Sequence, residues 1–107
     1  MQNSPPGLSA YFDAANAQDV DAFVACFTPD AQVKDEGRIH QGHENIAIWN
    51  RGVNKKYNCM HVVKSWDETN DGAYLGVEVS GTFPGSPVNL TFRVTLLGGK
   101  ISALEIG

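Results

Sequence analysis

The stretch Val88-Asn-Leu-Thr-Phe-Arg-Val-Thr-Leu-Leu97 alternates between apolar and polar side chains. This period of two is typical of a β-strand that buries one face and exposes the other. The predicted inner face carries Leu90, Phe92, Val94 and Leu96, and the outer face carries Asn89, Thr91, Arg93 and Thr95. The stretch therefore predicts one strand of a sheet whose inner face covers an apolar core.

Further strands are predicted on both sides of this stretch. Similar patterns occupy residues 31–36, 60–67, 73–83 and 100–106. The last four strands are separated by turn-forming residues at 70–72, 84–87 and 98–99, which are rich in Asn, Asp, Gly and Pro. Connections this short predict an antiparallel meander in the C-terminal half.

The N-terminal half instead repeats its apolar residues every three to four positions, which is the period of an amphipathic helix. Three helices are predicted, with core faces formed by Leu8, Tyr11, Phe12 and Ala15, then Val20, Phe23, Val24 and Phe27, then Ile46, Trp49, Asn50 and Val53. Ser4 and Pro5 would start the first helix, and Pro29 would stop the second. We expect an α+β fold, in which a cone-shaped, curved, mainly antiparallel sheet wraps around three N-terminal helices.

Length and composition restrict the class of protein. The chain has 107 residues, which predicts one domain over residues 1–107. Twelve acidic against eight basic residues give a net charge of −4, so we expect no nucleic acid partner. No apolar run approaches the roughly 20 residues that cross a bilayer. The first residues also lack the pattern of a signal peptide, so we expect a cytoplasmic protein with no membrane partner.

Two polar side chains are predicted to point inward. Asp35 shares a strand face with Ala31 and Val33, so alternation directs its carboxylate toward the interior. Burial would raise its pKa, as a general base working near neutral pH requires. Alternatively, Asp35 is solvated at a frayed strand end. Tyr11 lies on the apolar face of the first helix, where it is either a core tyrosine or a donor to a ligand oxygen.

Other residues are candidates for the wall of a pocket. They are Phe27, Val33, Trp49, His61, Leu90 and Phe92. Trp49 is either plain core or an aromatic wall against a flat ligand. His61 would be a proton carrier in the pocket if it faces inward, but alternation does not decide its face. His40 and His43 lie close to Asp35 in the chain, but no regular element predicts a shared face, so we expect no metal and no cofactor.

Much of the chain resembles the nuclear transport factor 2-like superfamily, in its SnoaL-like polyketide cyclase and ketosteroid isomerase branch. The resemblance runs from Tyr11-Phe-Asp-Ala-Ala-Asn-Ala-Gln-Asp-Val-Asp-Ala-Phe23 through Phe27-Thr-Pro-Asp-Ala-Gln-Val-Lys-Asp35. It continues at Gly42-His-Glu-Asn-Ile-Ala-Ile-Trp49 and at the final strands, Leu90-Thr-Phe-Arg-Val94 and Gly99-Lys-Ile-Ser-Ala-Leu104. It implies the cone-shaped fold of that superfamily.

The resemblance also implies roles for two residues. Tyr11 falls where ketosteroid isomerases keep an oxyanion-hole tyrosine, and Asp35 falls where they keep the general base. The protonated aspartate of that site falls on Leu90 or Thr91, neither of which can act as an acid. We therefore do not expect a true steroid isomerase.

Three functions remain open. The first is proton abstraction alpha to the carbonyl of a small apolar compound, in an isomerase- or cyclase-type reaction with Asp35 as base and Tyr11 as oxyanion donor. The second is binding of a hydrophobic ligand without turnover. The third is a scaffold that forms a homodimer through the outer face of the sheet, where Glu78 and Arg93 would lie.

Overall fold

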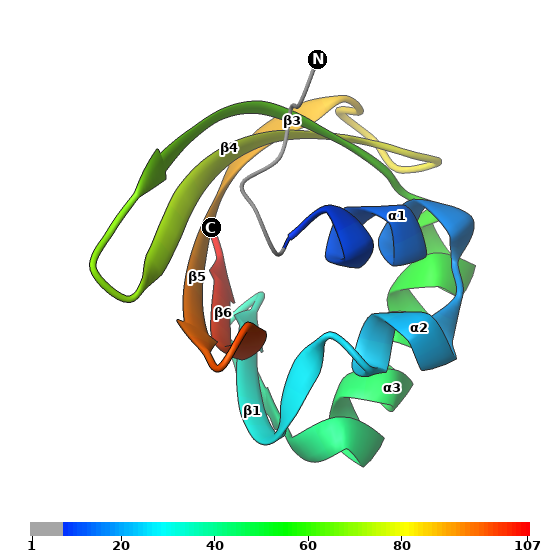
Figure 1. Cartoon of the computed structure of the whole chain (residues 1–107). Helices are drawn as coiled ribbons and strands as arrows, with labels where there is room; N and C mark the ends of the chain where they lie inside the picture. Colours follow the sequence, from blue (N-terminus) through cyan, green and yellow to red (C-terminus); the bar gives the residue numbers. More distant parts are fainter. Residues whose placement is uncertain (1–7) are drawn as a thin grey trace.

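A strongly curved sheet partly encloses the helices in the computed structural model, which describes residues 8–107 (Figure 1). The helices are α1 (Ser9–Ala17), α2 (Val20–Val24) and α3 (Gly42–Tyr57). The strands are β1 (Phe27–Asp35), β2 (Arg38–Gln41), β3 (Met60–Glu68), β4 (Gly72–Ser80), β5 (Val88–Leu97) and β6 (Lys100–Ile106). The predicted start of the first helix at Ser4 and Pro5 lies outside the described residues.

The six strands lie in the order β2-β1-β6-β5-β4-β3. The pair β1 and β6 is parallel, and the other four neighbouring pairs are antiparallel. Strands β3 to β6 form the predicted meander. Strand β1 pairs with β6 at one end of the meander, and the chain reaches β3 at the other end through β2 and α3. The predicted α+β fold with a curved sheet around three helices is confirmed, as a mixed sheet.

The faces of β5 follow the predicted alternation. Phe92 and Val94 are buried against the helices, whereas Asn89, Thr91 and Arg93 are exposed on the outer surface. On β4, Leu75 and Val77 are likewise buried, as are the other members of its inner face. The apolar core therefore lies between the concave face of the sheet and the three helices (Figure 1).

The second helix is shorter than predicted, and Phe27 belongs to a strand. Asp19 caps α2 by accepting a hydrogen bond from the Ala22 backbone N–H at 3.1 Å, but the helix ends at Val24. Phe27 already pairs with Ile101 of β6. Pro29 follows two residues later and favours extended backbone before it. The apolar spacing of this segment is compatible with a helix, but pairing with β6 holds Phe27 in the extended conformation of a strand.

Strand β2 was not predicted. Its four residues are exposed or half-buried, so they carry no apolar alternation that would mark a strand. Glu36 and Gly37 both have positive φ and form the tight turn that folds β2 back onto β1. The predicted strand at 73–83 is also shorter, because it ends at Ser80.

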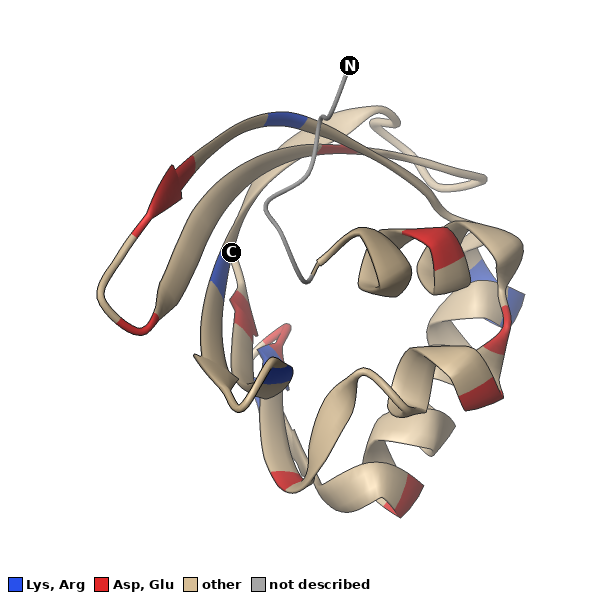
Figure 2. Cartoon of the chain, in the orientation of Figure 1, with Lys and Arg blue, Asp and Glu red and all other residues tan. Residues whose placement is uncertain are grey.

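Charged residues are spread over the outside of the fold (Figure 2). The eight basic residues lie on β1, β2, α3, β3, β5 and β6. Lys34 and Lys64 pair with Glu105 and Glu78 across neighbouring strands, at 3.9 and 3.4 Å. This dispersed arrangement contrasts with the clustered basic surface that binds nucleic acid.

Candidate functional site

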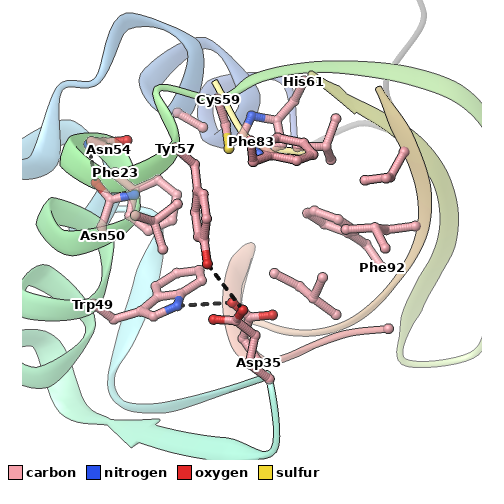
Figure 3. Close-up of a pocket in the computed structure, with 18 of the residues that line it drawn as sticks. Phe23, Asp35, Trp49, Asn50, Asn54, Tyr57, Cys59, His61, Phe83 and Phe92 are labelled. Atoms are coloured by element: carbon pink, nitrogen blue, oxygen red, sulfur yellow. Dashed lines mark hydrogen bonds between the residues drawn. The ribbon is translucent and has the colours of Figure 1, made fainter. Parts of the chain in front are cut away.

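A cavity of about 620 Å³ lies between the inner face of the sheet and helices α1 and α3 (Figure 3). Such a volume is in the range of small-molecule sites. Its wall is mostly apolar. The apolar and aromatic residues that line it include Phe23, Val53, Val79, Phe83, Val88, Leu90, Phe92 and Ile106. The polar residues that line it include Tyr11, Asp35, Glu36, Trp49, Asn50, Asn54, Tyr57 and His61.

Asp35 presents its carboxylate to this cavity from the end of β1 (Figure 3). Ala31 and Val33 on the same strand face are fully buried, as alternation predicted, whereas Asp35 itself is half-buried. The indole Nε1–H of Trp49 donates a hydrogen bond to Asp35 Oδ2 at 3.2 Å. Asp35 is therefore anchored by α3 and is not a freely solvated strand end.

The surroundings of Asp35 shift its pKa upward. The largest cause is burial, which disfavours the charged carboxylate. The hydrogen bond from Trp49 acts in the opposite direction, the neighbouring Glu36 raises the pKa further, and His40 lowers it. The carboxylate is thus a stronger base than an exposed one and still keeps a donor that stabilises its charge.

Glu36 has a partner on the same wall. The Tyr57 hydroxyl at the end of α3 donates a hydrogen bond to Glu36 Oε2 at 3.4 Å. The Tyr57 ring also meets Phe83 edge-on, with ring centroids 5.7 Å apart. These contacts tie the end of α3 to the turn after β1, beside Asp35.

Tyr11 lines the cavity from α1 and is almost fully buried. Its ring contacts Phe12, Phe23 and Phe27, with centroids 4.8, 4.9 and 6.0 Å away. Burial raises the pKa of its phenol, and the negative charge of Asp35 raises it further. The hydroxyl therefore keeps its proton and can donate it in a hydrogen bond.

His61 lies across the cavity from Asp35, on β3 (Figure 3). Met60 and Val62 are exposed on the outer face, so His61 points inward. The register between β3 and β4 shifts between Val63 and Ser65, which also returns Trp66 to the inner side opposite Leu75. Burial lowers the pKa of His61 to about 4, so its ring is neutral at pH 7.

The other predicted wall residues divide into two groups. Trp49, Leu90 and Phe92 line the cavity together with His61. Phe27 and Val33 do not line it, and their prediction as pocket residues was wrong. Both are fully buried in the core: Phe27 packs behind the Tyr11 and Phe23 rings, and Val33 lies on β1 where α3 packs against it.

Several lining residues were not singled out by sequence reasoning. Asn50 is 5% exposed, and its Oδ1 accepts a hydrogen bond from Asn54 Nδ2 at 3.2 Å. Its position on the apolar face of the third helix was the available signal. Cys59 also lines the cavity, and burial raises the pKa of its thiol. Glu36 and Tyr57 gave no sequence signal, because they meet only in the folded chain.

The two loop histidines considered for a metal have separate environments. His40 stacks on Trp49 with centroids 5.8 Å apart, and His43 Nε2 lies 2.9 Å from the Phe27 carbonyl oxygen. Within residues 8–107, no three His, Cys, Asp or Glu side chains are grouped as metal ligands would be.

Residues 8–103 match the family model of the SnoaL-like domain. The chain belongs to the SnoaL-like domain family. A presumed polyketide cyclase from Sinorhizobium meliloti has a similar structure, with 38% sequence identity, a TM-score of 0.94 and full coverage of both chains. The predicted family is thereby confirmed. No protein of curated function matches the chain.

More distant structures share the SnoaL-like fold. A protein from Catenulispora acidiphila with a ketosteroid isomerase-like fold, solved with trimethylamine, has 17% identity and a TM-score of 0.85 over 97% of this chain and 85% of its own. An epoxide hydrolase/cyclase-like enzyme, described in pyran ring formation in salinomycin, has 21% identity and a TM-score of 0.80 over 94% and 85%. Among the described residues, no helix is long and apolar enough to cross a membrane.

Proposed function

We propose that this SnoaL-like protein abstracts a proton alpha to the carbonyl group of a small apolar compound, with Asp35 as the general base. The C–H proton passes to the Asp35 carboxylate, and the electron pair of that bond moves into the carbonyl to form an enolate. The Tyr11 hydroxyl donates a hydrogen bond to the enolate oxygen. In a substrate with a neighbouring C=C bond, return of the proton to the γ carbon of the dienolate gives isomerisation. Attack of the enolate on a second carbonyl, with the proton passing from Asp35 to the new alkoxide, gives cyclisation.

The observation that carries the proposal is that the Asp35 carboxylate faces a largely apolar cavity. An ionised carboxylate is costly there, and its pKa is raised accordingly. Trp49 Nε1–H donates to one oxygen at 3.2 Å, and the carboxylate faces the cavity in which a substrate would lie. A base is most effective when its pKa approaches the working pH, so this arrangement favours proton abstraction.

The enolate oxygen needs a hydrogen-bond donor that stays protonated. Tyr11 meets this need, because burial and the charge of Asp35 both raise the pKa of its phenol. The resemblance puts the acid of ketosteroid isomerases at Leu90 or Thr91; Leu90 lines the cavity, whereas Thr91 is exposed on the outer face. The enolate would thus have one donor fewer, which argues against the steroid reaction itself.

The test is exchange of the C2 protons of 1-tetralone, a flat two-ring ketone, for deuterium in D₂O, followed by NMR. Asp35→Asn should slow the enzyme-dependent exchange by about 10²–10⁴-fold, because a general base contributes that much. Its affinity for 1-tetralone should remain close to that of the wild type. Asp67→Asn is the matched control, since Asp67 is exposed on β3 and does not line the cavity. Exchange within threefold of the wild type in Asp35→Asn would contradict the proposal.

The second candidate function is binding of a hydrophobic ligand without turnover, which the largely apolar lining supports. In that case Asp35→Asn would change affinity alone, and the wild type would show no exchange above the buffer rate.

In either case we propose that the chain forms a homodimer through the outer sheet face. Met60, Val62 and Tyr74 expose apolar surface there, and Arg93 lies over the Tyr74 ring. Arg93→Glu should shift the mass measured by light scattering from dimer to monomer.

A further inference from the structure

The side chain of Asn16 on α1 contacts both the backbone and the ring of His61 on β3. Asn16 of α1 donates from Nδ2 to the His61 carbonyl oxygen at 3.0 Å and accepts from the His61 backbone N–H at Oδ1, at 2.7 Å. The same Oδ1 lies 3.3 Å from His61 Nδ1. The two backbone contacts determine which end of the Asn16 amide is oxygen, because only the oxygen accepts and only the nitrogen donates.

This arrangement determines the tautomer of the imidazole. Asn16 Oδ1 can only accept, so the His61 Nδ1 that faces it carries the proton. A neutral imidazole has one N–H and one lone pair, so Nε2 is then the acceptor. No described residue makes a hydrogen bond to Nε2. The lowered pKa of His61 agrees with a ring that stays neutral in this wall.

The neutral ring is far from the proposed base. Strands β1 and β3 are separated by β6, β5 and β4 in the sheet, and Figure 3 shows Asp35 and His61 on opposite sides of the cavity. The wall between them includes Leu90 and Phe92, which offer no hydrogen-bonding side chain. Phe92 also meets the His61 ring edge-on, with centroids 6.1 Å apart. A flat ligand that fills the cavity would therefore have one polar end at each wall.

We infer that His61 Nε2 accepts a hydrogen bond from the ligand, and that the ligand is a flat carbonyl compound with a hydroxyl group at the end remote from its carbonyl. The inference rests on the proposed function, which places the carbonyl at Asp35 and Tyr11. A ligand hydroxyl gives this acceptor a partner, whereas a ligand with an ether or a hydrogen at that place covers it without one. Unsatisfied buried acceptors cost binding free energy, so His61 is a specificity-determining residue.

Binding measurements with matched ketones test this assignment. The two-ring probes are 6-hydroxy-1-tetralone, its methyl ether and unsubstituted 1-tetralone, and the same three substituents are tested on a three-ring ketone. All are titrated by calorimetry at pH 7. In the series whose length spans the cavity, the wild type should bind the hydroxyketone about tenfold more tightly than the methyl ether or the unsubstituted ketone. His61→Phe keeps a flat ring but removes the acceptor and should abolish this preference, whereas Asp35→Asn should retain it. Equal affinities in the wild type, or a preference that survives in His61→Phe, would overturn the inference.

A second measurement does not depend on any variant. The two-bond ¹H–¹⁵N correlations of the His61 ring distinguish a proton on Nδ1 from one on Nε2, and we expect the Nδ1–H pattern at pH 7. An Nε2–H or doubly protonated ring would overturn the inference even if exchange of 1-tetralone by Asp35 is observed. Conversely, a hydroxyl preference without exchange would contradict the proposed base and leave the role of His61 intact.

Discussion

Asp35 and His61 face the same cavity from opposite walls, and burial acts against the charge of both. The two side chains differ in their hydrogen-bond partners, and therefore in how far their charged forms are stabilised. Trp49 donates to the Asp35 carboxylate and stabilises its charged form. On the His61 ring, Asn16 contacts Nδ1 alone, and no described residue accepts a hydrogen bond from a proton on Nε2. The comparison teaches that the hydrogen-bond partners of a side chain in the cavity wall, as much as its burial, determine which protonation state is favoured.

The largest expected effect concerns the His61 wall. The pKa of His61 falls from an ordinary 6.5 to about 4, so the unfolded chain binds more protons than the native protein between these values. The contribution of neutral, buried His61 to the free energy of unfolding is fully present above pH 6.5 and is lost as the pH falls toward 4. His61→Phe should remove this dependence. The difference in unfolding free energy between wild type and variant should therefore change by about 3 kcal/mol between pH 7 and pH 4, measured by urea denaturation.

The matched control is His43→Phe, because His43 does not line the cavity and is not among the groups that shift the pKa of Asp35. It reports how much of the change follows from removing any histidine. If the free energy difference between wild type and His61→Phe stays constant from pH 7 to pH 4, His61 is not held neutral by burial, and the contrast with Asp35 fails.

A smaller effect is expected at the Asp35 wall from Trp49→Phe. The phenyl ring keeps an aromatic surface toward Phe23 and His40 but lacks the N–H that donates to Asp35. Because that donor stabilises the carboxylate, its loss should raise the pKa of Asp35 further. The acid limb of the pH profile for 1-tetralone exchange should move to higher pH, and the rate below that limb should fall about tenfold. An unchanged profile would show that the indole does not tune the base.

The smallest effect is expected from Glu36→Gln. The negative charge of Glu36 raises the pKa of Asp35, so its removal should move the acid limb of the exchange profile to lower pH, opposite to Trp49→Phe. The exchange rate at pH 7 should fall by only a few-fold, because this charge is close to the surface and is screened. The amide can still accept from Tyr57, which keeps the end of α3 in place. A shift in the same direction for both variants would contradict this account of the wall.

The sequence predicted the direction of a side chain correctly wherever one helix or strand determines that direction. Alternation along β1 placed Asp35 on the same face as Ala31 and Val33, and the structure agrees. The period of α1 likewise placed Tyr11 inward. In both cases the side-chain direction follows from the backbone geometry of a single regular segment.

The sequence was silent where the answer depends on two elements. Trp49 and Asp35 meet because α3 packs on β1, which no spacing within the chain reveals. His61 could not be oriented by alternation, because the irregularity between Val63 and Ser65 puts Val62 outside and Trp66 inside. Asn16 carried no signal either, since its partner is a backbone segment of β3.

The most direct test of the account is a crystal structure with 6-hydroxy-1-tetralone bound. The ketone oxygen should lie within hydrogen-bond distance of the Tyr11 hydroxyl, C2 of the ring system should lie against the Asp35 carboxylate, and the phenol should lie at His61 Nε2. A ligand bound in the reverse orientation, with its ketone at His61, or bound outside the cavity, would contradict it.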